Sequence, residues 1–269
     1  MISIDAYKDA YFVNGLPVPY TLKKGGTIMI NPIKVKDYSV YDMVKSILLL
    51  NKNETNDISI IQMSYLDYLI EVVFPQNEGF GQQFIMLFNL CLGIDKLYFE
   101  KDKGKNVLVL AEKDDEGNET VSKIINRKEF DEIRNIVLNQ NDPNYDDRYI
   151  NPEVRDLMIQ YQRAKNQNVH YPSFEERKSY VCSKIGKTYS ELNEMTCREF
   201  DLIYDHCVNS EIYLAQKIIQ ASFKYDVKED IKHPLFENKR DPYAEIFTDT
   251  SALSNKGITG AEALNSLNL

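Results

Sequence analysis

The chain has 269 residues, of which 43% are hydrophobic and 11% aromatic, and its formal net charge at pH 7 is −9. A chain of this size and apolar content can bury a substantial core, which excludes disorder over its whole length. The acidic balance argues against nucleic acid as the main partner, because phosphate binding needs a concentrated basic surface. No apolar run approaches the ~20 residues that span a bilayer, so we expect no membrane partner.

The start of the chain and its cysteines indicate the cellular compartment in which the protein is expected. MISIDAYKDAYFVNG lacks the charged and long apolar regions of a secretory signal. The four cysteines follow no short spacing that would indicate a disulfide or zinc framework. We therefore expect a reducing cytoplasm.

The N-terminal part predicts a small β module. YFVNG, LPVPY and TIMINPIKV have the composition of short strands joined by glycine-containing turns. Pro17 and Pro19 suit an edge strand or an extended arm, because a central strand would lose hydrogen bonds. Such a module either adds to the sheet of a partner or forms a local hairpin over the first helices, and the sequence leaves both alternatives open.

Helices and a second β section follow. Asp37 is expected to cap a helix that runs through Leu50, and further helices are predicted over 57–74, 80–92 and 127–140. Between the last two lie three predicted antiparallel strands, separated by segments of strong turn composition: KLYFE, NVLVLAEK and TVSKIIN.

The second half is predicted to be helical, over 152–168, 173–185 and 197–225. Two capping boxes support the helix starts, namely Ser173 with Glu176 and Thr196 with Glu199. The chain turns irregular after residue 234, and 248–269 is small and polar, as expected of a flexible tail or of an arm that orders on a partner. The predicted fold class is therefore α+β and mainly helical, with domains over 1–140, 141–247 and 248–269, the last being the tail.

The acidic segment 142–153 resembles a calcium-binding loop in part. Four oxygen-bearing residues occupy positions one, three, five and twelve of an EF-hand loop: Asp142, Asn144, Asp146 and Glu153. Position six of that loop requires glycine for a sharp turn, but here it is Asp147. We therefore interpret the segment as an acidic interdomain loop and expect no tight calcium binding.

Other reactive side chains do not form a recognisable site. Cys197, His206 and Cys207 share one predicted helix, but their spacing does not place three ligands on one face. His170 and His233 follow no local signature of nucleophilic catalysis. The sequence therefore predicts no catalytic, cofactor-binding or metal-binding residues, and an intracellular enzyme whose site forms only in three dimensions remains the alternative.

The overall plan resembles tailed-bacteriophage tail and baseplate assembly proteins, of the baseplate hub assembly or tail assembly chaperone type. Three short pieces carry the resemblance: the β segment ending in INPIKVKDY, the phrase KTYSELNEMTCREFDLIY at 187–204, and the low-complexity end GITGAEALNSL. Together they cover about a quarter of the chain, and the central β section from Lys96 to Ile125 has no counterpart in the resemblance.

The resemblance implies a non-enzymatic role through contacts with other phage tail or baseplate proteins. It brings no catalytic residues and no cofactor. The implied location is the host cytoplasm during assembly, with the virion as a further location left open. Whether the protein forms an oligomer is also left open.

Overall fold

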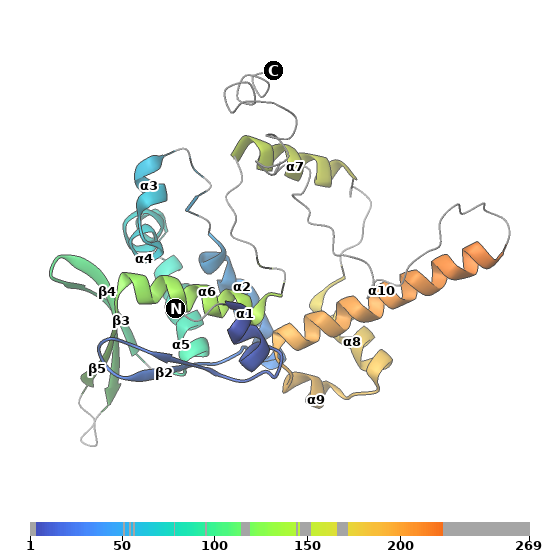
Figure 1. Cartoon of the computed structure of the whole chain (residues 1–269), viewed down its shortest axis with the longest axis horizontal. Coiled ribbons are helices and arrows are strands. Elements are labelled where there is room, and N and C mark those ends of the chain that lie inside the picture. Colours follow the sequence, from blue (N-terminus) through green and yellow to red (C-terminus); the bar gives the residue numbers. More distant parts are fainter. Residues whose placement is uncertain are drawn as a thin grey trace. The chain divides into compact units, whose positions relative to one another are not determined.

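The protein is described by a computed structural model (Figure 1). The structure describes residues 4–50, 52–53, 55, 57–77, 79–94, 96–113, 119–143, 145, 152–165 and 172–222. The chain divides into two compact units, Met1–Cys207 and Val208–Leu269. The predicted tail over 248–269 lies outside the residues that the structure describes.

The chain begins with helical turns. Helix α1 (Ile4–Tyr7) continues into a π-helix (Lys8–Phe12), in which Phe12 is buried in the main core. The prediction of a strand over YFVNG is therefore wrong. A helical turn lets Phe12 reach the core, and the Val13 amide closes that turn by donating to the Lys8 carbonyl.

The stretch that follows is a local hairpin. Strands β1 (Val18–Thr21) and β2 (Thr27–Ile30) pair antiparallel, with Val18 opposite Ile30. Alternate side chains of both strands are buried, as the period of two along a strand requires. Glu132 and Glu129 of the later helix α6 (Arg127–Asn141) accept hydrogen bonds from the Tyr20 hydroxyl and the Lys23 amide, respectively. These contacts favour the local hairpin over a free arm.

The tip of the hairpin touches the second sheet. The Lys24 carbonyl accepts a hydrogen bond from the Ile124 amide, 3.3 Å away. Gly25 has a φ of +109°, and a Cβ added to it would lie 2.7 Å from the Cα of Lys123. Only glycine fits here, because both the positive φ and the neighbouring backbone exclude a side chain.

The main core forms around two helices predicted from the sequence. Helix α2 (Tyr38–Leu49) packs against α5 (Gly79–Leu92). Asp37 occupies the N-cap position of α2, although its side chain makes no capping hydrogen bond. Phe84 and Phe88 of α5 stack on each other and lie against Phe130 of α6. One aromatic cluster therefore joins α5 to α6.

The helix predicted over 57–74 is interrupted. It is split into α3 (Ile58–Gln62), α4 (Tyr65–Tyr68), a π-helix (Leu69–Val73) and a 3₁₀ turn (Phe74–Gln76). The break occurs because Ser64 has extended backbone angles, and its hydroxyl accepts a hydrogen bond from the Asp67 amide as a new N-cap.

The predicted central strands form one sheet, and the α+β, mainly helical class is confirmed. Strands β3 (Lys96–Asp102), β4 (Lys105–Lys113) and β5 (Glu119–Ile125) are antiparallel in the order β3-β4-β5. Helix α6 (Arg127–Asn141) follows, and Asn126 with Glu129 forms a capping box at its start.

The remaining described helices are α7 (Pro152–Lys165), α8 (Phe174–Ile185), α9 (Tyr189–Asn193) and α10 (Cys197–Ala221). Both predicted capping boxes are present: Ser173 and Glu176 exchange hydrogen bonds, as do Thr196 and Glu199.

Residues 173–207 are bound to the N-terminal part of the chain. The Cys197 amide donates to the Ile33 carbonyl, and Arg177 donates to the Tyr38 hydroxyl at 2.7 Å. These contacts lie within the first compact unit, which ends at Cys207 inside α10.

Candidate functional site

A polar pocket of about 480 Å³ lies where α3 and α4 meet the start of α6. Most of its lining comes from the segment around the break after α3, and one residue comes from α6. The lining residues are Ser59, Gln62, Met63, Ser64, Asp67, Glu71 and Arg127.

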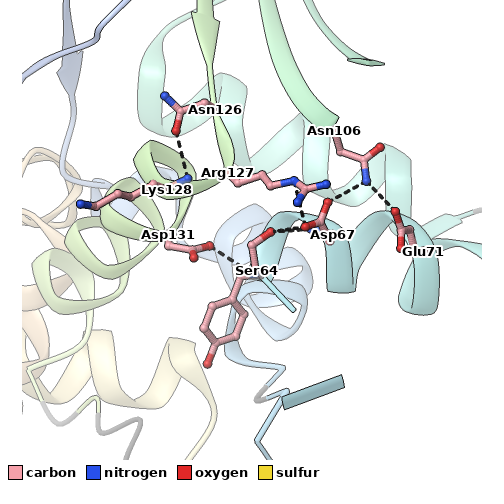
Figure 2. A network of polar contacts seen from close by, with 9 residues as sticks. Ser64, Asp67, Glu71, Asn106, Asn126, Arg127, Lys128 and Asp131 are labelled. Atoms are coloured by element: carbon pink, nitrogen blue, oxygen red, sulfur yellow. Dashed lines mark hydrogen bonds and ion pairs between the residues drawn. The ribbon is translucent and has the colours of Figure 1, made fainter. Parts of the chain in front are cut away.

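Asp67 lines the pocket, and Figure 2 shows three side chains converging on its carboxylate. The Ser64 hydroxyl donates to Oδ2 at 2.7 Å, and the Asn106 amide donates to Oδ1 at 2.8 Å. Arg127 Nε lies 3.0 Å from Oδ2 as an ion pair without hydrogen-bond alignment. Asp67 is only 5% exposed, so these partners supply the stabilisation that water would otherwise give.

Asn106 connects the pocket to the sheet. It is buried at the start of β4 and donates through the same nitrogen to Asp67 and to Glu71 Oε1, 2.9 Å away. A single amide thus joins two carboxylates that would otherwise repel each other. This arrangement fixes α4 and the following π-helix against the sheet.

A second group of contacts joins α6 to the start of α4. Asp131 accepts a hydrogen bond from the Tyr65 amide at 3.0 Å. The Arg134 guanidinium lies 3.6 Å from the centre of the Tyr65 ring, and its Nε donates to the Leu48 carbonyl. Burial raises the pKa of the Asp131 carboxyl above its ordinary value, and the Tyr65 amide and the charge of Arg134 oppose that rise.

The chemistry available in this pocket is charge pairing and hydrogen bonding. The Ser64 hydroxyl is engaged as the N-cap of α4 and as a donor to Asp67, and no histidine lines the pocket. Among the described residues, no group of three or more His, Cys, Asp or Glu side chains is arranged to hold a metal ion. The pocket residues thus position α4 between the sheet and α6.

The second candidate is a surface of α10. Large apolar side chains in the C-terminal half of this helix are exposed to solvent: Ile212 by 49%, Leu214 by 58%, Ile218 by 71% and Ile219 by 47%. Exposing several large aliphatic side chains on one helix is unfavourable in water, and such patches mark sites of protein contact. We call Val208, Ile212, Ala215, Ile218 and Ile219 the α10 face.

The structure describes only some of the residues of the calcium-loop pattern and of the histidines weighed from the sequence. Asp142 is the C-cap of α6 and Glu153 lies in the first turn of α7, whereas Asn144 and Asp146 lie outside the described residues. His170 and His233 also lie outside them.

Cys197, His206 and Cys207, which the sequence did not predict to be zinc ligands, differ in their exposure to solvent. Cys197 is buried at the start of α10, where burial and nearby acidic groups raise its thiol pKa to about 12. Cys207 is partly exposed and His206 is exposed further along the helix. Buried thiols of high pKa are poor nucleophiles, which fits Cys197 as a core residue.

Sequence reasoning missed the network around Asp67. A local signal existed, because Ser64 and Asp67 stand three residues apart, as in a helix-capping pattern. The partners Asn106 and Arg127 are distant in sequence, and nothing in their local patterns indicates a contact with Asp67.

Comparison with known proteins finds no relative: no family model, curated protein sequence or solved structure matches the chain. Among the helices that the structure describes, none combines the length and apolar character of a membrane-spanning segment.

Proposed function

We propose that this chain is a non-enzymatic protein of phage tail or baseplate assembly, acting through contacts with other tail or baseplate proteins. It serves as an assembly chaperone or as a structural component, in the host cytoplasm during assembly. The three sequence pieces at 15–38, 187–204 and 257–267 support the phage assignment by resemblance.

The α10 face is the single observation that carries a role in protein contacts. Burying one aliphatic side chain of the size of isoleucine contributes roughly 1.5–3 kcal/mol. Ile212, Ile218 and Ile219 are about half or more exposed in this chain, so a partner that covers them gains that burial. The pocket around Asp67 supports an enzyme less well, because its carboxylates are held by structural partners.

The test is affinity capture of the tagged full-length chain from cells in which the source phage replicates, with the captured proteins identified by mass spectrometry. The proposal predicts enrichment of tail or baseplate proteins over a capture with the tag alone. It also predicts that a variant carrying Ile212→Glu and Ile219→Glu recovers at least tenfold less of them.

Ser210→Glu is the control, because it also adds a glutamate to the same helix, on the side away from the α10 face. This variant should capture like the wild type. Recovery of no tail or baseplate protein by the wild-type chain would refute the proposed function.

A further inference from the structure

The α10 face has the spacing of a helix-packing seam. Val208, Ile212, Ala215 and Ile219 are separated by four, three and four residues, so they follow one line along the helix. Ile218 lies beside that line and is the most exposed member, at 71%. The apolar surface is thus wider than a minimal two-helix seam and suits a bundle.

The same line begins inside the protein. Cys197, Phe200 and Tyr204 precede Val208 at spacings of three, four and four residues on the same helix. Cys197 is in the main core, while Phe200 and Tyr204 belong to the cluster that joins α8, α9 and α10. The first turns of α10 thus pack against other helices, whereas Ile212, Ile218 and Ile219 further along the helix are about half or more exposed.

Charge and side-chain size favour a second copy of the chain as the occupant. Residues 208–222 contain one acidic residue, Glu211, and one basic residue, Lys217, so their net charge is zero in a chain of net charge −9. Two acidic chains repel each other least where they meet through an uncharged segment. Ala215, between Ile212 and Ile219, also allows two helix backbones to approach closely.

We infer that the α10 face is the self-association surface of this protein, covered by the same face of a second copy. This inference rests on the proposed function: the chain associates with itself through the α10 face and contacts tail or baseplate proteins in that associated form, so that substitutions in the face also lower their capture. Residues 208–222 extend only about 22 Å at 1.5 Å per residue. A contact this short buries less than the roughly 1,200 Å² of a standard interface, so the association should be reversible and depend on concentration.

Sedimentation equilibrium of the purified full-length chain tests this directly, from about 5 to 500 µM, a range that captures weak association. The expected result is an average mass that rises from the monomer towards a dimer or larger species. Ile212→Glu and Ile219→Glu, tested singly, should each abolish the rise, whereas Ser210→Glu should leave it unchanged. Both isoleucines are about half exposed, so the variants should fold, and circular dichroism checks this.

A wild-type chain that stays monomeric over the whole range would overturn the inference. Association that survives both isoleucine substitutions would also overturn it, because another surface would then be responsible. The two proposals fail separately. A monomeric chain that still captures tail proteins refutes only self-association, and a self-associating chain that captures none refutes only the phage role.

Discussion

Replacing Gly25 by alanine tests how closely the hairpin tip approaches the second sheet. Two costs add in this variant. An L-residue at positive φ costs roughly 1–2 kcal/mol, and forcing a methyl group against packed atoms costs typically about 1–3 kcal/mol. The contact is severe because the added Cβ would lie 2.7 Å from the Lys123 backbone. Gly25→Ala should therefore destabilise the fold by about 2–5 kcal/mol.

Gly26→Ala is the matched control on the neighbouring residue. Gly26 also has a positive φ, +79°, but nothing lies within 4 Å of an added Cβ. It should cost only about 1 kcal/mol, the conformational part alone. The chain has no tryptophan, so urea unfolding is best followed by far-ultraviolet circular dichroism. Equal losses of unfolding free energy in the two variants would refute the close approach of the hairpin to β5.

Three further predictions concern single side chains. Asp67→Ala removes one of the two acceptors of buried Asn106 and the ion-pair partner of Arg127, so it should cost about 3 kcal/mol in urea unfolding. A cost below about 1 kcal/mol would contradict the network. Thr196→Ala should cost about 1 kcal/mol through loss of the N-cap, and an unchanged midpoint would mean that α10 starts elsewhere. Burial raises the pKa of Cys91 to about 12, so its reactive thiolate is scarce at pH 8. Iodoacetamide should therefore modify partly exposed Cys207 first, as read by mass spectrometry, and early labelling of Cys91 would show that it is accessible.

Local patterns predicted the regular elements well. Strand-like composition and turn-forming segments placed β1 to β5, because β-branched and aromatic residues suit strands and the ends of strands need turn residues. Capping boxes placed the starts of α8 and α10, because the hydrogen bonds that define them are made within four residues.

Two local predictions failed because a competing local interaction was overlooked. The aromatic residues of YFVNG favour a strand by composition, but burial of Phe12 by a helical turn prevails. The apolar period over 57–74 continues through Ser64, whose side chain instead ends one helix and starts the next.

The candidate sites depend on contacts that no local pattern contains. Asp67 meets Asn106 and Arg127 only because the sheet and α6 fold back onto α4. The exposure of the α10 face was also not predictable, since a buried and an exposed apolar stripe have the same spacing along a helix. The residue types were therefore visible in the sequence, but not their accessibility.

We propose a role for this chain in phage tail or baseplate assembly, and this role can be tested directly. The most direct measurement is electron microscopy of particles made by the source phage after deletion of this gene, with either the wild-type chain or the Ile212→Glu, Ile219→Glu variant supplied from a plasmid. The account predicts particles with missing or malformed tails after deletion, rescue by the wild-type chain, and failure of the variant to rescue. Normal tails and undiminished infectivity without the gene would contradict it.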